Sequence, residues 1–209
     1  MTVEVDFRLG VKPSARVTEE IVPGLVWGVR CCGSVATPID EIAEPKPDEW
    51  LWLHFNLTDN RAPKWLAATT LLPKPAIERL LSTDDTQQLV PLGDCVAGAF
   101  FDLLHDFDKT VDDFGQFRFA LTERVLVTAR RRALTSIEAV RRRIETGHRY
   151  ASPIDLLNAI VDQIATTIDQ MRRAGHPHIL GSECDVLYVP EAAETIRRKV
   201  DVMLSYRRE

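Results

Sequence analysis

The chain has 209 residues, of which 45% are hydrophobic and 27% are charged, a composition typical of a soluble globular protein. Its 26 basic and 31 acidic residues give a formal net charge of −5, which argues against a general affinity for nucleic acid. No run approaches the roughly 18 apolar residues that cross a bilayer, and the N-terminus lacks the basic and then apolar pattern of a secretory signal.

The four cysteines are Cys31, Cys32, Cys95 and Cys184. They form no CxxC pair and no regular framework of the kind found in secreted proteins. We therefore expect a reduced, cytosolic protein.

The first part of the chain alternates between apolar strands and breakers. The sequence predicts a strand over Gly24–Cys32, a connecting loop over Pro38–Asp48 and a second strand over Glu49–Leu57. Both faces of the second strand are largely apolar, which indicates burial on both sides. His54 lies among tryptophans on one of these faces, so we interpret it as a hydrogen-bonded structural residue rather than a ligand.

The middle of the chain predicts two helices, then a set of strands, then one basic helix. Capping residues and proline favour the two helices over Arg61–Thr70 and Leu72–Leu81. The basic helix ends at Gly147. The pattern of the predicted strands is typical of antiparallel pairing, and the basic helix is predicted over Leu134–Thr146. The strands are predicted over Gln88–Leu92, Cys95–Leu104, Phe114–Leu121 and Arg124–Thr128.

The stretch from Ser152 to Met171 has the clearest helical pattern in the chain. Ser152 suits the N-cap, and the side opposite the apolar seam is polar and predicted to be solvated, Asn158 included. A core helix and a helix–helix assembly element both fit this pattern. The apolar seam, with spacings of 3, 4, 3, 4 and 3, is Ile154, Leu157, Val161, Ile164, Ile168 and Met171.

A final helix is predicted over Pro190–Arg208, where apolar residues again follow a 3, 4, 3 spacing. Gly175, Pro177 and Gly181 interrupt the pattern between the two helices. We therefore expect a helical pair with a turn between its members. The apolar residues of the final helix are Ala193, Ile196, Val200 and Met203.

The order of these features resembles one known family. Four stretches carry the resemblance: WLWLHFNLTDNRAPKWL, LLPKPAIERLLSTDD, FRFALTERVLVTARRRALTSIEAVRRRIETG and SPIDLLNAIVDQIATTIDQM. Their succession is similar to the cytoplasmic part of the CorA superfamily of divalent cation transporters, and closest to its zinc-transporting ZntB branch.

The resemblance implies a fold of the α/β (α+β) class. It implies a cytoplasmic α/β/α domain over residues 1–150, with a mixed, largely antiparallel sheet, and then a pair of long C-terminal helices over residues 151–209. Full-length members add two membrane helices and assemble as pentamers around a funnel. This chain lacks those helices and their Gly-Met-Asn signature, so we expect no transport by this fragment alone. It is then an excised or truncated part of a transporter, and on its own it can be a monomer.

One acidic stretch is a candidate metal site. Carboxylate oxygens suit Mg²⁺, and an added histidine suits Zn²⁺. A solvated acidic hairpin tip explains the same residues without any metal. The six candidate ligands, which fall within twelve residues, are Asp102, His105, Asp106, Asp108, Asp112 and Asp113.

A second group, His176, His178, Glu183, Cys184 and Asp185, contains zinc-type ligands but follows no zinc-finger spacing, so an ordinary polar turn is the favoured interpretation. A basic run could bind nucleic acid or anionic lipid, but without stacking aromatics a solvated, partly ion-paired face is favoured. The run consists of Arg124, Arg130 to Arg132, Arg141 to Arg143 and Arg149.

No GxSxG, P-loop, GxGxxG or HExxH motif is present, so we expect no enzyme and no required cofactor. The first functional hypothesis is the regulatory or funnel domain of a divalent cation transporter, at the cytoplasmic face of the inner membrane. Its partners are Zn²⁺ or Mg²⁺ and further copies of the chain, with no nucleic acid. The alternative is a stand-alone α/β interaction module that binds a partner helix along the seam of residues 154–171.

Overall fold

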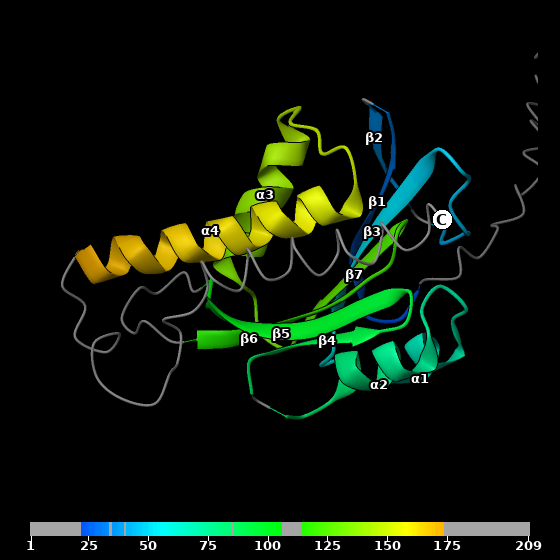
Figure 1. Ribbon diagram of the computed structural model, residues 1–209, viewed down its shortest axis with the longest axis horizontal. Helices are drawn as coiled ribbons and strands as arrows, with labels where there is room; N and C mark the ends of the chain where they lie inside the picture. The colour runs from blue at the N-terminus through cyan, green and yellow to red at the C-terminus, as the bar shows by residue number, and fades with distance from the viewer. Residues whose placement is uncertain (1–21, 34, 40, 85, 106–113, 174–209) are drawn as a thin grey trace, which may run out of the picture.

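The computed structural model describes residues 22–173, except 34, 40, 85 and 106–113 (Figure 1). Within these ranges the chain forms seven strands and four helices. Their order is β1 (Leu25–Cys32), β2 (Val35–Pro38), β3 (Glu49–Asn56), α1 (Ala62–Ala68), α2 (Lys74–Leu81), β4 (Gln88–Leu92), β5 (Cys95–Leu103), β6 (Phe114–Leu121), β7 (Val125–Arg130), α3 (Thr135–Glu145) and α4 (Pro153–Arg173).

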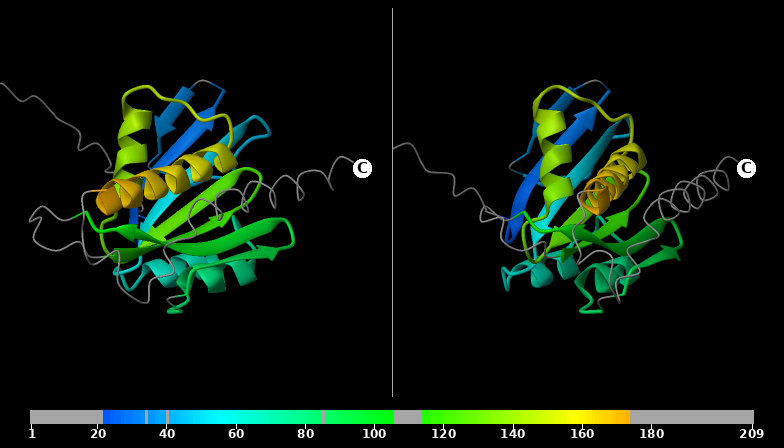
Figure 2. Two further views of the ribbon diagram at one scale, coloured as in Figure 1. Left: turned by 60° about the vertical axis from the view of Figure 1, so that its left-hand side comes forward. Right: turned by 90° about the vertical axis from the view of Figure 1, so that its left-hand side faces the viewer.

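The strands form a single sheet in the order β2-β1-β3-β7-β6-β5-β4. β3 and β7 pair in parallel at its centre, and every other neighbouring pair is antiparallel. The helices α1 and α2 cover one face of the sheet, and α3 and α4 cover the other (Figures 1 and 2). The predicted α/β/α fold with a mixed, largely antiparallel sheet is confirmed.

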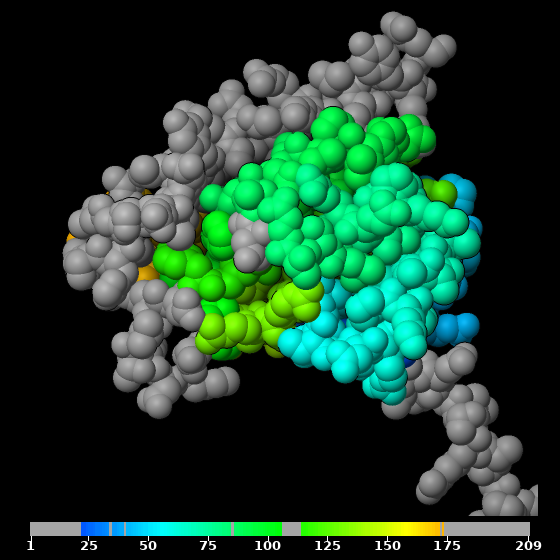
Figure 3. Space-filling model, turned by 90° about the horizontal axis from the view of Figure 1, so that it is seen from below, coloured from blue at the N-terminus to red at the C-terminus, as the bar shows by residue number. Residues whose placement is uncertain are grey.

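Each face of the sheet has its own hydrophobic core. Leu51, Leu53 and Phe55 of β3 point toward α1 and α2, whose residues form much of the surface seen in Figure 3. Trp50 and Trp52 point the other way and join the core beneath α3 and α4. This alternation explains why β3 is apolar throughout, as its sequence predicted.

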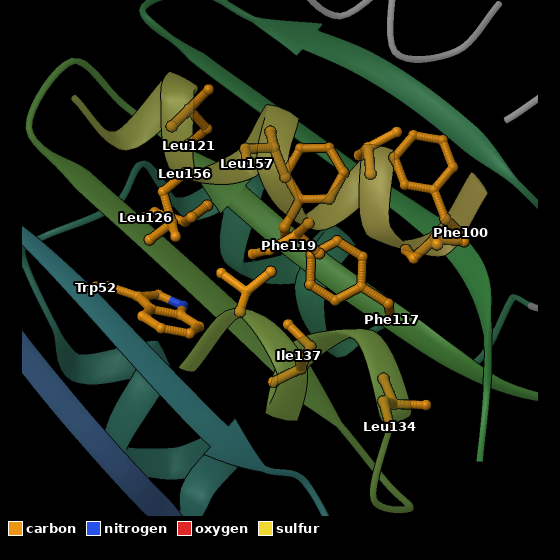
Figure 4. Close-up of a cluster of buried hydrophobic side chains, with 14 of the residues drawn as sticks. Trp52, Phe100, Phe117, Phe119, Leu121, Leu126, Leu134, Ile137, Leu156 and Leu157 are labelled. Atoms are coloured by element: carbon orange, nitrogen blue, oxygen red, sulfur yellow. The ribbon is translucent and has the colours of Figure 1, made fainter. Parts of the chain in front are cut away.

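The core beneath α3 and α4 is the more aromatic of the two. Phe117 and Phe119 of β6 stack with ring centroids 5.7 Å apart, and Phe119 stacks at the same distance on Phe100 of β5. Figure 4 shows these rings packed beneath the leucines of α4 and beside Ile137 of α3. Since the rings fill the space between sheet and helices, they fix how closely both helices approach the strands.

The short strand β2 is absent from the sequence prediction. It follows a turn at Gly33, whose φ of +53° favours glycine, and it pairs with β1 from Cys32–Val35 to Val29–Pro38. Four residues carry too little periodicity to identify a strand, and here pairing with β1 decides the conformation.

The apolar seam of α4 faces the protein's own sheet. Leu157, Val161 and Ile164 of the predicted seam have no exposed surface, and neither do Leu156 and Ile160 beside them. All five pack in one core with β3, β5, β6 and β7. The alternative of a partner helix along the 154–171 seam is therefore wrong, because the centre of that seam is already covered. The division of the chain at residue 150 stays a prediction, and residues 174–209 lie outside the described part.

The polar side of α4 also departs from expectation at one position. Asn158 was predicted to be solvated, but its side chain is only 8% exposed. Its Oδ1 atom is buried and accepts no hydrogen bond within the described part of the chain.

We expect Leu157→Ala to lower the free energy of unfolding by about 2–5 kcal/mol, because it removes a fully buried side chain and leaves a cavity. The matched change Gln170→Ala, at an exposed position of the same helix, should stay within about 0.5 kcal/mol. Denaturant unfolding measures both. Equal, small effects would contradict the burial of α4 in the core.

Candidate functional site

Asp102, the first of the predicted metal ligands, is an internal structural residue. It lies near the end of β5, and its side chain is 1% exposed. One carboxylate oxygen accepts hydrogen bonds from Leu103 N (2.8 Å) and Ser136 Oγ (2.7 Å), and the other accepts one from Ser136 N (3.0 Å). The carboxylate thus caps the first turn of α3 and fastens that helix to the sheet.

Burial raises the pKa of Asp102 to about 6, while its hydrogen bonds with Ser136 and Leu103 act in the opposite direction. Burial thus favours the neutral carboxyl, and the hydrogen bonds from Ser136 and Leu103 favour the ionised carboxylate.

His105 follows β5 and is half-buried, and its backbone N–H donates to the carbonyl oxygen of Ala133 (2.9 Å). The remaining predicted ligands, Asp106, Asp108, Asp112 and Asp113, lie outside the described residues. In the part of the chain that the structure describes, no three Cys, His, Asp or Glu side chains come together as a metal site. The acidic metal site therefore stays a prediction.

The second predicted group, formed by His176, His178, Glu183, Cys184 and Asp185, also lies outside the described residues. Cys31 and Cys95 are buried, and burial raises the pKa of their thiols to about 11 and about 12. Both thiols therefore stay protonated at neutral pH, which makes them poor zinc ligands.

A buried polar network joins the two parallel strands at the centre of the sheet. His54 Nδ1 lies 2.8 Å from Thr128 Oγ1, and Arg130 Nε donates to His54 Nε2 (3.0 Å). Thr128 Oγ1 also accepts from Trp52 Nε1 (2.9 Å) and donates to the carbonyl oxygen of Leu53 (3.3 Å). Because Nε2 of His54 must accept, its proton resides on Nδ1.

The same histidine is neutral for electrostatic reasons. Burial, followed by the positive charges of Arg130 and Arg141, lowers the pKa of His54 well below its ordinary value. The interpretation of His54 as a hydrogen-bonded structural residue is confirmed. Its partner Thr128 could not be found from sequence, since the two are 74 positions apart.

The network continues outward to α3. Trp27 of β1 stacks on His54 with ring centroids 4.1 Å apart, and the guanidinium of Arg141 lies 5.2 Å from the centroid of Trp27. Arg141 is also paired with Glu138 (3.1 Å) and with Glu145 on its own helix. This stack of a cation on two aromatic rings links α3 to the sheet.

The basic run thus divides into two groups. Arg130 and Arg141 contact the interior network. The others are exposed, and of these Arg143 donates to Gln163 of α4: Arg124, Arg131, Arg132, Arg142, Arg143 and Arg149. The predicted solvated, partly ion-paired face agrees with this arrangement.

The sequence model of the family described as "CorA-like Mg2+ transporter protein" matches residues 47–198. The chain belongs to the CorA family.

Within this CorA family the chain is similar to zinc transport proteins called ZntB. It is 26% identical over 175 residues to ZntB of Klebsiella pneumoniae, which covers 80% of this chain and 51% of that protein. It is 24% identical over 163 residues to ZntB of Enterobacter sp., covering 74% and 49%. The chain spans about half the length of these relatives.

Solved structures show the same fold. The ZntB cytoplasmic domain of Vibrio parahaemolyticus matches with a TM-score of 0.64 at 16% identity, over 85% of this chain and 73% of that one. The soluble domain of CorA from Methanocaldococcus jannaschii matches with a TM-score of 0.56 at 10% identity, over 87% and 92%. Within the described ranges, no helix of this CorA-family chain is long and apolar enough to cross a bilayer.

Asp102→Asn should reveal the raised pKa as a pH-dependent stability difference. The folded pKa of about 6 lies above the unfolded value of about 3.8, so this group stabilises the fold below pH 4, and that contribution is lost as pH rises through 6. The stability of wild type minus that of the variant should therefore be about 2 kcal/mol larger at pH 4 than at pH 7.5. Denaturant unfolding at both pH values measures it, and a pH-independent difference would contradict the assignment.

His54 should remain neutral, with its proton on Nδ1, at the pH where an ordinary histidine titrates, because protonation would place a second charge beside Arg130 in the interior. The ¹⁵N chemical shifts of the two ring nitrogens distinguish the tautomers and the cation. Titration of this ring near pH 6.5, or a proton on Nε2, would contradict the hydrogen-bond scheme.

Proposed function

We propose that this chain is the cytoplasmic domain of a CorA/ZntB-like divalent cation transporter, lying at the cytoplasmic face of the inner membrane. The observation that carries the proposal is the family match over residues 47–198, on a chain that has the α/β/α fold of such domains. In this proposal the domain senses or funnels Zn²⁺ or Mg²⁺ and takes part in assembling the oligomer.

The proposed metal-sensing residues follow β5 in the sequence. The acidic segment from His105 to Asp113 begins three residues after Asp102. Close carboxylates repel one another, so a bound cation would lower the free energy of that segment. We propose that Asp106, Asp108, Asp112 and Asp113 supply oxygen ligands, with His105 as a nitrogen ligand for Zn²⁺. Asp102 precedes these residues in the sequence, and its carboxylate accepts hydrogen bonds from Ser136.

Contacts of Asp102 support a route from the end of β5 to the helices. Asp102 holds the first turn of α3, and α3 packs beside α4 in one hydrophobic core. A cation that binds two arrangements of the acidic segment with different affinity would shift the population of α3 positions through this contact. The helix α4 would carry such a shift along its length of about 30 Å.

The alternative of a stand-alone module that binds a partner helix receives no support from α4, since the proposed binding seam is buried in the core. Assembly in this proposal uses other surfaces. The pentamer that the resemblance implies belongs to full-length members, and we propose no fixed oligomeric state for the isolated chain.

Equilibrium dialysis of the full 209-residue chain against Zn²⁺ and Mg²⁺ tests the metal role. We expect saturable binding that falls at least about tenfold in the triple variant Asp108→Asn, Asp112→Asn, Asp113→Asn, because the lost carboxylates supply most of the ligand charge. The control Glu41→Gln, Glu44→Gln, at exposed acidic positions on another loop, should bind like wild type.

No saturable uptake at millimolar metal would overturn the sensing role, and so would equal loss of binding in the triple variant and the control. Sedimentation of the same samples with and without metal reports whether cation binding changes the assembly.

A further inference from the structure

Within the described part of the chain, the sheet ends at two strands that pair on one side only, β2 and β4 (Figure 1). At β2, Ile39 N donates to the carbonyl oxygen of Gly28 (3.0 Å), and the register with β1 continues from Val29–Pro38 to Cys32–Val35. Hydrogen-bonded pairs alternate along an antiparallel ladder, so Ala36 directs its N–H and C=O away from β1. These two groups form a short open edge that another strand can pair with.

Exposed apolar side chains lie at the same end of the sheet. Among the described residues, the exposed large hydrophobic side chains are Val26 (42%) in β1 and Val35 (56%) in β2. Ala36 packs toward the core beneath α3 and α4, so its neighbour Val35 points to the opposite face of the sheet. A strand beside β2 with apolar side chains on that face would remove Val35 from water.

The N-terminal segment of the chain has the sequence pattern of such a strand. Apolar residues occupy every second position from residue 3 to residue 11, and polar residues or glycine lie between them. Valine and phenylalanine, which favour strands, supply four of the five apolar positions. Pro13 and Ser14 then predict the end of the strand. The apolar residues are Val3, Val5, Phe7, Leu9 and Val11.

The position of this segment in the chain favours the edge of β2 over that of β4. Val22 accepts a hydrogen bond from Leu25 N (3.2 Å) and leads directly into β1. A strand added beside β2 lies two strand spacings from β1, roughly 10 Å, whereas one added beside β4 lies six spacings away, roughly 29 Å. The linker between Val11 and Val22 spans roughly 36 Å when extended, so it reaches β2 in either strand direction. Pro91, inside β4, lacks an N–H and further limits pairing at that edge.

The charges at this edge agree with one orientation of the segment. Cys31 lies opposite Ala36 in the register of β1 and β2. Burial raises the pKa of Cys31, and the positive charge of Arg149 opposes that rise, so this guanidinium acts on the Ala36 face of the edge. Glu4 and Asp6 alternate with the apolar residues of the N-terminal segment. A strand whose apolar side lies on the other face would therefore present both carboxylates on the side of Arg149.

We infer that residues 3–11 of the same chain form an additional strand along the outer edge of β2, with their apolar side chains on the face of Val35 and with Glu4 and Asp6 on the face of Ala36. The added strand supplies backbone partners for the N–H and C=O of Ala36. It also shields this edge from pairing with another molecule. The inference does not depend on the proposed metal role, because it involves none of the proposed metal ligands.

Amide hydrogen exchange and backbone NOEs of the full 209-residue chain, both measured by NMR, test this strand. We expect a protected Ala36 amide and NOEs between Ala36 and at least one residue of the segment 3–11. Val5→Asp places a charge on the apolar side of the strand, so exchange at Ala36 should accelerate at least about tenfold. The matched control Val17→Asp, in the linker, should leave exchange at Ala36 as in wild type.

The amide of Val127, in the buried strand β7, reports whether both variants remain folded, and the wild-type NOEs decide the question if either variant unfolds. An unprotected Ala36 amide, the absence of NOEs from Ala36 to residues 3–11, or equal exchange in the two variants would overturn the inference. Measurement at two protein concentrations separates the possible occupants. Protection of Ala36 that falls on dilution would show that a second copy pairs with this edge, and it would overturn the assignment to the same chain.

Discussion

The burial of both faces of the central parallel pair, β3 and β7, is the constraint on which the rest of the structure depends. Strands that are apolar on both sides are stable only when helices cover each face, and here α1 and α2 cover one while α3 and α4 cover the other. The helix α4 is thereby committed to the domain core. Its apolar seam cannot serve at the same time as a free assembly surface.

Polar contacts then fix the relative positions of strands and helices that the apolar layers alone do not determine. Thr128 bridges β7 to Trp52 and His54 of β3 in the interior, and Asp102 binds the first turn of α3. Each contact joins elements that hydrophobic packing alone would allow to slide. The stack of Arg141 on Trp27 and His54 adds a second link between α3 and the sheet, so this helix is held near both ends.

Much of this fold could be predicted from the sequence, because period-2 and helical patterns identify β3, β5, β6 and α4 directly. The rest depends on contacts between distant residues. The strand β2 is defined by its pairing with β1. Sequence alone presents Asp102 as a candidate metal ligand, because its hydrogen-bond partner Ser136 is 34 positions away. Tertiary packing decides that the apolar side of α4 contacts the sheet and that Asn158 is buried. A helical projection of the sequence shows neither.

In the proposed route, cation binding to the acidic segment near β5 acts through the capping carboxylate of Asp102 and changes the stability of the two packed helices α3 and α4. Amide hydrogen exchange of the full chain, with and without saturating Zn²⁺ or Mg²⁺, tests this claim most directly. We expect altered protection in the first turn of α3 and along α4, with little change in α1 and α2. Metal that binds without any change in the protection of α3 and α4 would contradict it.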